Sequence, residues 1–177
     1  MYLDFDGVLH PDAAYLDRYG RIYLKSQGTL FGYAQHLSEI LDPYPDVKIV
    51  LSTSWVRVKG FGKTLKKMPS DLQSRVIGAT WHSAYKQDTE MLEWWEYSSR
   101  FQQIQRDVLR RKPDAWLALD DDTQGWPLDQ QHNLVICESD FGLSSIGTRD
   151  LLQAKMKRIF GTPSQISNRL NSFKSIS

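Results

Sequence analysis

Four short apolar runs, separated by longer segments of mixed polarity, constrain the fold of this chain more than any other feature. They occupy residues 1–5, 47–51, 115–119 and 134–137. Short, nearly continuous apolar runs are typical of strands that are covered on both faces, as in a parallel sheet. We therefore predict a sheet built from four parallel strands.

Three of the intervening segments have the apolar spacing of amphipathic helices. They are residues 33–41, 98–111 and 148–160. Ser98 or Ser99 is placed to cap the second helix, and Gly161 to end the third. Strands that alternate with helices imply right-handed crossovers. The predicted fold is therefore a three-layer, Rossmann-like α/β domain with a doubly wound parallel sheet.

The longer connections predict small additions to this sheet. Residues 10–30 are expected to form a hairpin flap over the site, in which residues 15–19 pair with residues 21–24 around Gly20. The segment 55–95 has room only for helices or a small lid. We therefore expect no large cap domain, and a site that is open to bulky substrates.

Length and composition indicate one globular domain, which we assign to residues 1–161. Residues 162–177 are rich in Ser, Asn and Gln and are predicted to be a loose tail. No apolar stretch approaches the roughly 18 residues of a membrane span, and the amino terminus lacks the features of a signal peptide. We expect a cytoplasmic protein with no membrane partner, and a monomer by default.

Charge and cysteine content exclude further classes. The formal net charge of +1 gives no argument for general affinity for nucleic acids or membranes, although the basic segment 57–67 leaves a local contact with a polyanion open. The single cysteine, Cys137, excludes an internal disulfide framework. Because it lies in an apolar run, it is expected to be a buried, unreactive thiol.

Polar residues close three of the apolar runs. The first run ends with Asp4 and Asp6 ahead of Gly7, the second is followed by residues 52–54, and the third by residues 120–122. Open parallel sheets bind ligands at the carboxyl ends of their strands, so these groups are expected to converge on one crevice. The alternative is that they are strand-end turns and helix caps.

This combination of groups indicates phosphoryl transfer. Clustered carboxylates repel one another, and a hard cation that prefers oxygen ligands, Mg²⁺ or Ca²⁺, removes that cost. Hydroxyl and backbone N–H groups after the second strand suit a phosphate. A carboxylate can also act as the nucleophile by forming an aspartyl-phosphate.

Three motifs resemble the signatures of the haloacid-dehalogenase-like (HAD) phosphatases. Residues 4–9 look like the first signature, an Asp-x-Asp-Gly after an apolar strand. Residues 49–52 resemble the second, an apolar strand that ends in Ser or Thr, and residues 117–121 resemble the fourth, an apolar strand that ends in paired acids. The order and spacing of the motifs agree with the family.

A narrower resemblance runs from residue 1 to about residue 152. The chain is similar to the small HAD domain of multi-domain RNA-repair proteins in five segments: residues 51–55, 76–80, 100–104, 118–122 and 142–143. The link to RNA is an association of that family and does not come from these residues. It implies a phosphorylated substrate, with nucleic-acid ends or nucleotides as one class.

The resemblance implies a role for each acid. Asp4 attacks phosphorus to form the aspartyl-phosphate. Asp6 protonates the leaving group and then activates water. Asp4, the backbone carbonyl of Asp6 and Asp120 hold Mg²⁺, with Asp121 as a further ligand or a partner through water. The implied activity is a magnesium-dependent phosphomonoester hydrolase.

The resemblance also implies a phosphate site. Ser52 binds a phosphoryl oxygen, with Thr53 and Ser54 beside it, and Gly7 belongs to the substrate-binding loop. For Ser54 a role as a helix cap is the alternative. His10 follows this loop, and it is expected to be a neutral hydrogen-bonding residue, with a substrate contact as the alternative.

The chain departs from the family at the third signature, which is usually a Lys that neutralises the phosphoryl group. Arg100 is our candidate for that role, and Lys86 is the alternative; the planar fork of an Arg differs from a compact ammonium. Two other classes therefore stay open. One is a phosphate- or metal-binding module with weak or no catalysis, acting with a partner. The other is a different phosphotransferase or a dehalogenase on the same fold, although Asp6 argues against a dehalogenase.

Overall fold

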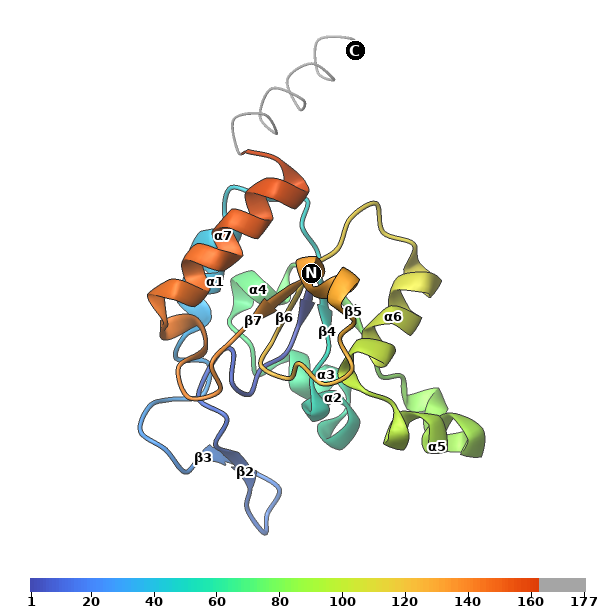
Figure 1. Cartoon of the computed structure of the whole chain (residues 1–177). Helices are drawn as coiled ribbons and strands as arrows, with labels where there is room; N and C mark the ends of the chain where they lie inside the picture. The colour runs from blue at the N-terminus through green and yellow to red at the C-terminus, as the bar shows by residue number, and fades with distance from the viewer. Residues whose placement is uncertain (163–177) are drawn as a thin grey trace, which may run out of the picture.

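Five short parallel strands form the central sheet of the protein (Figure 1). The structure is a computed structural model that describes residues 1–162. The strand order is β5-β4-β1-β6-β7. The strands are β1 (Tyr2–Leu3), β4 (Ile49–Leu51), β5 (Val76–Ala79), β6 (Ala118–Asp120) and β7 (Leu134–Ile136).

The prediction of four parallel strands is confirmed, but a fifth strand was missed. β5 lies at the edge of the sheet beside β4. Its Ile77 is 53% exposed, and Gly78 adopts a positive φ of 156°. The short apolar segment of β5 is interrupted by Gly78, so it did not match the continuous apolar runs on which the prediction relied.

The three predicted helices are present, with starts that differ from the prediction by one or two residues. They are α1 (Ala34–Leu41), α6 (Arg100–Arg111) and α7 (Ile146–Phe160). Ser99 caps α6 by accepting a hydrogen bond from the backbone N–H of Gln102, whose side chain accepts one from Ser99 in return. Gly161 ends α7 with a positive φ of 87°.

Short helices fill the connections between these elements. They are α2 (Ser54–Lys59), α3 (Phe61–Leu65), α4 (Ser70–Gln73), α5 (Thr89–Tyr97) and the 3₁₀ turns η1 (Ser83–Gln87), η2 (Leu128–Asn133) and η3 (Gly142–Ser144). The segment after β4 therefore holds β5 in addition to the predicted helices. No large cap domain is present within residues 1–162 (Figure 1).

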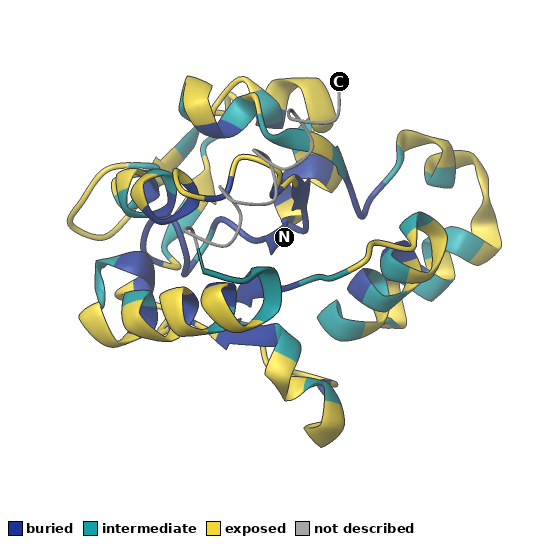
Figure 2. Ribbon diagram, turned by 90° about the horizontal axis from the view of Figure 1, so that it is seen from above, coloured by how far each residue is buried: buried dark blue, intermediate teal, exposed yellow. Residues whose placement is uncertain are grey.

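Helices cover both faces of the sheet, as its alternating side chains require. Leu3, Leu51 and Leu119 point into the core that contains α1 and α7. On the other face, Tyr2 and Ala118 pack with α6. Figure 2 shows the buried strands between helices whose outer faces are exposed, which gives the predicted three layers.

The predicted hairpin flap is formed by β2 (Ala14–Leu16) and β3 (Ile22–Leu24), which pair in antiparallel register. The first strand is shorter than predicted because Asp17 starts the turn. Its Oδ1 accepts hydrogen bonds from the backbone N–H groups of Tyr19 and Arg21. The hairpin projects from the end of the molecule at which the sheet strands finish (Figure 1).

The strand order determines where a ligand site can form. From β1 the chain adds β4 and β5 on one side, and then returns to add β6 and β7 on the other. Side chains that follow β1 lie at this reversal, where doubly wound sheets open a crevice at their carboxyl ends.

Of the predicted tail, residues 163–177 lie outside the described residues. Among the described helices, none has the length and apolar character that crossing a membrane requires.

Candidate active site

Asp4 follows β1 and is almost fully buried, at 4% exposure. Its backbone N–H donates to the carbonyl of Leu119 at 3.1 Å, which fixes it between β1 and β6. Its Oδ1 accepts a hydrogen bond of 2.8 Å from the N–H of Phe5. Burial raises the pKa of Asp4 to about 6 even though Arg100 opposes the shift, with Asp6 and Asp121 adding to it.

Arg100, the first residue of α6, bridges the acids from the side. Its Nη2 lies 3.2 Å from Asp4 Oδ2, its Nε lies 3.3 Å from Asp120 Oδ2, and its Nη1 donates to the carbonyl of Ser52. Burial alone would lower the pKa of Arg100, but the neighbouring acids, Asp4 first, raise it overall. One guanidinium therefore contacts the ends of three adjacent strands.

Lys86, the alternative to Arg100, is placed elsewhere. It lies on η1 and lines a cavity of about 280 Å³ together with Val56 and Trp81. Within residues 1–162 it forms no ion pair with the acids that follow the strands. The structure thus brings Arg100, and not Lys86, to the carboxyl ends of the central strands.

Asp4, Asp120 and Asp121 form a cluster in which one ligand atom of each lies within 4.8 Å of the others. Burial, followed by the charge of Asp4, raises the pKa of Asp120. Asp120 Oδ2 has no hydrogen-bond partner within the described chain. Three carboxylates face one guanidinium, and oxygen donors suit Mg²⁺, so these residues fit the predicted ion.

Asp6 is not a member of this cluster, and its carboxyl group contacts two side chains. Trp55 Nε1 donates to Asp6 Oδ2 at 2.8 Å. His10 Nε2 lies 3.1 Å from Asp6 Oδ1, and His10 Nδ1 accepts from the N–H of Phe31 at 3.4 Å. Because Nδ1 is an acceptor, we assign the proton to Nε2, which donates to Asp6. His10 is fully buried, which fits the predicted hydrogen-bonding role.

The three hydroxyl residues that follow β4 lie in different environments. Ser52 is buried, and its Oγ has no hydrogen-bond partner among residues 1–162. Thr53 caps α2, where its side chain accepts from the N–H of Trp55 at 3.4 Å. Ser54 is the exposed first residue of that helix. The helix cap is therefore Thr53 and not Ser54, for which capping was the alternative, while Ser52 has an unpaired hydroxyl and its carbonyl contacts Arg100.

Two glycines bring backbone close to these groups. Gly7 has a positive φ of 66°, and a Cβ added there would overlap the carboxyl group of Asp121. Gly142 has a φ of 46° and packs against the carbonyl of Val8, which also accepts a hydrogen bond from the N–H of Leu143 at 3.0 Å. Larger residues at either position would displace the loop after β1.

The remaining predicted residues have structural partners. Asp122 N–H donates to Asp120 Oδ1 at 3.0 Å, and Asp122 Oδ1 accepts from Gln124 N–H at 2.7 Å, so Asp122 shapes the loop. Cys137 is buried, and burial, followed by the charge of Asp120, raises the pKa of its thiol. Sequence reasoning missed Trp55 as the partner of Asp6; its place directly after the hydroxyl cluster was the available signal.

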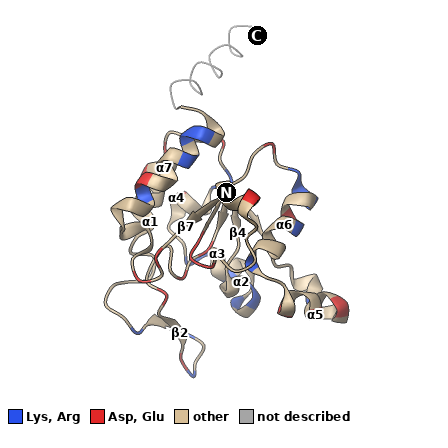
Figure 3. Cartoon of the chain, in the orientation of Figure 1, with Lys and Arg blue, Asp and Glu red and all other residues tan. Residues whose placement is uncertain are grey.

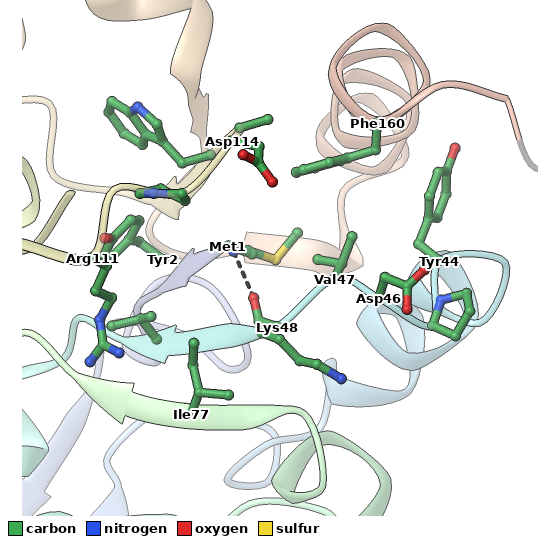
Figure 4. A pocket seen from close by; sticks show the side chains of 15 residues that line it. Met1, Tyr2, Tyr44, Asp46, Val47, Lys48, Ile77, Arg111, Asp114 and Phe160 are labelled. Atoms are coloured by element: carbon green, nitrogen blue, oxygen red, sulfur yellow. Dashed lines mark hydrogen bonds between the residues drawn. The ribbon is translucent and has the colours of Figure 1, made fainter. Parts of the chain in front are cut away.

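A cavity of about 720 Å³ lies at the opposite end of the sheet, where the strands begin (Figure 4). The amino group of Met1 is buried there and donates to the carbonyl of Lys48 at 2.7 Å. Burial lowers the pKa of this amine to about 5. The cavity contains none of the predicted site residues, and open sheets bind ligands at the other end, so we place the candidate site at the acids.

Three features define a haloacid-dehalogenase-like domain. An acid follows the central strand, paired acids follow one neighbouring strand, and a hydroxyl cluster follows the other. A family model described as "HAD domain in Swiss Army Knife RNA repair proteins" matches residues 1–146, and the chain belongs to this family. Comparisons with curated proteins and with solved structures gave no match.

Proposed function

We propose that this domain is a magnesium-dependent phosphomonoester hydrolase that acts through an aspartyl-phosphate. The observation that carries the proposal is the pair of environments around its two leading acids. Asp4 is buried against Arg100 and two further carboxylates, while Asp6 is held apart by His10 and Trp55. Two carboxylates with separate surroundings suit separate roles as nucleophile and general acid–base.

In the first step, a carboxylate oxygen of Asp4 attacks phosphorus, and the bond from phosphorus to the ester oxygen breaks. Asp6, entering in its protonated form, gives its proton to that leaving oxygen. The burial of Asp4 leaves its carboxylate poorly solvated, which favours attack once it is ionised. The products of this step are an acyl phosphate of Asp4, which is the aspartyl-phosphate, and a free alcohol.

In the second step, water attacks the phosphorus of the aspartyl-phosphate and Asp6 accepts its proton. Phosphate leaves and Asp4 returns to its carboxylate form. Hydrogen bonds from His10 and Trp55 reach both carboxyl oxygens of Asp6 and fix the direction of its side chain. These two donors therefore position Asp6 for proton transfer.

Charge on the transferred phosphoryl group is balanced from two sides. Arg100 and the unpaired hydroxyl of Ser52 are available to bind its oxygens, with Thr53 and Ser54 beside them. When bound, Mg²⁺ supplies positive charge that lowers the cost of bringing an anionic phosphate to carboxylates. Asp4, Asp120 and Asp121, with the backbone carbonyl of Asp6, would hold it.

The substrate that we propose is the phosphorylated end of a nucleic acid. The description of the family names RNA repair proteins. No large cap covers the site within residues 1–162, so a phosphate at the end of a long polymer has access.

The test is release of phosphate from p-nitrophenyl phosphate and from 5′- or 3′-phosphorylated oligonucleotides, with Mg²⁺ or EDTA. We expect turnover that requires Mg²⁺ and is lost in Asp4→Asn, with Asp122→Asn as a control that keeps the catalytic acids. If Mg²⁺ and phosphate bind without turnover, the proposal is wrong and the domain is a binding module. Turnover of small phosphates alone would contradict the nucleic-acid substrate.

A further inference from the structure

Positive charge is concentrated in two segments that flank the candidate site. Residues 14–25 and 54–67 contain eight Lys and Arg residues and one acid, Asp17, in a chain whose net charge is only +1. The cations are Arg18, Arg21, Lys25, Arg57, Lys59, Lys63, Lys66 and Lys67. All of them are exposed apart from the half-buried Lys59. Figure 3 shows part of this charge gathered on α2 and α3.

The hairpin adds exposed aromatic rings to this charge. Tyr15 and Tyr23 pair across β2 and β3 with ring centroids 6.5 Å apart, and they are 46% and 42% exposed. The alternate residues Ala14 and Ile22 pack against the core instead. The two tyrosines therefore belong to the outward face of the hairpin, where both rings are partly exposed.

Cations already lie over the exposed rings. Lys25 Nζ is 3.7 Å from the centroid of the Tyr15 ring. At the turn, Arg18 and Arg21 lie 4.8 and 5.2 Å from the centroid of Tyr19, which is 67% exposed. Aromatic faces interleaved with cations are the arrangement that single-stranded nucleic acids bind, because bases stack on the rings and phosphates contact the cations.

The hairpin and the basic helices form one surface beside the site. The hairpin follows directly from the loop that contains Asp6, and its base is fixed by a 2.8 Å hydrogen bond from Asp12 N–H to the carbonyl of Ser139. At its tip, the carbonyl of Gly20 accepts a hydrogen bond from Lys59 Nζ at the end of α2. The start of α2 lies at the proposed phosphate site.

We propose that this hairpin–α2–α3 surface binds the single strand whose terminal phosphate enters the site, with bases stacked on Tyr15, Tyr19 and Tyr23. The placement of the phosphate rests on the proposed function, but binding of the strand does not depend on turnover. Arg57 already pairs with Glu96 at 2.6 Å, so the lysines of α3 and the turn after it are the main phosphate contacts.

The test is equilibrium binding of a fluorescently labelled single-stranded RNA, measured by anisotropy on the Asp4→Asn background. We expect Tyr15→Ser with Tyr23→Ser to weaken binding about tenfold or more, since stacking on each ring contributes to affinity. Tyr97→Ser is the matched control, because Tyr97 is 83% exposed and belongs to α5, outside the hairpin, α2 and α3. It should leave the affinity unchanged.

The lysines are tested through salt dependence. Affinity for a single strand falls with salt by a log–log slope of about 0.7 for each phosphate contacted. Replacing Lys63, Lys66 and Lys67 together by Gln should reduce that slope. Hydrolysis of p-nitrophenyl phosphate, measured with Asp4 intact, should be unchanged in the tyrosine and lysine variants, which also shows that they fold.

The outcomes separate this surface from the proposed function. If the tyrosine changes weaken RNA binding but the protein shows no turnover, the RNA-binding surface is supported and the proposed phosphatase activity is wrong. If turnover of p-nitrophenyl phosphate is normal and neither the tyrosine nor the lysine changes alter RNA binding, the proposed RNA-binding surface is wrong. Equal binding of a phosphorylated peptide, weakened by the same tyrosine changes, would show that the partner is a phosphoprotein and would also overturn it.

Discussion

Trp55 Nε1 donates a 2.8 Å hydrogen bond to Asp6 Oδ2 across 49 positions of sequence, and this bond links α2 to the loop after β1. The other oxygen of Asp6 contacts His10. Because Ser52 and Thr53 directly precede α2, the same helix holds both the proposed phosphate site and the proposed general acid–base. A displacement of α2 would therefore affect binding and proton transfer together.

We predict that Trp55→Phe lowers kcat and leaves KM for small phosphates nearly unchanged. Phe keeps the ring packing against Phe5 and Phe31 but removes the N–H that fixes Asp6. A hydrogen bond to a charged group contributes about 1.5–3 kcal/mol, so the loss of kcat should be about tenfold or more. Trp116→Phe, on the other face of the sheet, is the control; equal losses in both variants would argue against a positioning role.

Arg100 is predicted to contribute both to stability and to activity, and the substitutions Arg100→Lys and Arg100→Gln should separate its charge from its geometry. Arg100→Gln leaves Asp4 and Asp120 buried without their cation, and it should destabilise the metal-free protein by about 3 kcal/mol at neutral pH, measured by urea unfolding. Arg100→Lys keeps the charge and should recover part of both stability and activity. Full activity in Arg100→Gln would exclude Arg100 from the phosphate site.

The positions of several proposed site residues could be predicted because they depend on strand ends alone. Asp4, Ser52 and Asp120 each follow a short apolar run, and parallel strands finish at one edge of the sheet. Arg100 could be proposed because it begins the helix before β6. The structure brings these four residues together, while their chemical roles stay predictions.

The rest depends on contacts that no local pattern encodes. Asp6 finds Trp55 because α2 folds back over the loop after β1, a tertiary arrangement that sequence spacing does not specify. β5 was missed because Gly78 interrupts its short apolar segment. The start of α7 at Ile146 was also missed, because Ser145 caps the helix ahead of its first predicted turn.

The acid cluster predicts an unusual dependence of stability on pH. The pKa of Asp4 is raised from 3.8 to about 6, first by burial, and that of Asp120 is raised as well. The folded state therefore retains protons that the unfolded chain releases. Without metal, we expect the contribution of Asp4 to stability to fall as pH rises from 3.8 to about 6.

Mg²⁺ should reverse this loss, because it binds the ionised carboxylates. We expect the increase in Tm caused by Mg²⁺ to grow across the same pH window, measured by thermal unfolding with Mg²⁺ or EDTA. In Asp4→Asn, which lacks one titrating group, the dependence on pH should be shallower. A Mg²⁺-induced increase in Tm that is the same below and above the window would contradict the assignment of the metal ligands.

The hydroxyl of Ser52 is predicted to lower the stability of the protein and to raise its activity. Its buried Oγ has no hydrogen-bond partner within residues 1–162, and an unpaired buried hydroxyl costs about 1–3 kcal/mol. Ser52→Ala should therefore leave the free energy of unfolding unchanged or raise it by up to about 1 kcal/mol. The same change should lower kcat/KM about tenfold, because a phosphoryl oxygen loses its donor.

Ser38→Ala is the matched control for this change, since Ser38 Oγ donates to the carbonyl of Ala34 at 3.2 Å within α1, far from the acids in the sequence. It removes the same atom and should leave kcat/KM unaltered. The decisive comparison is between urea unfolding and kinetics for each variant. If Ser52→Ala lost stability and activity together, its hydroxyl would be a structural group that the protein needs for folding. If Ser52→Ala keeps or gains stability but loses kcat/KM, the unpaired hydroxyl serves to bind a phosphoryl oxygen.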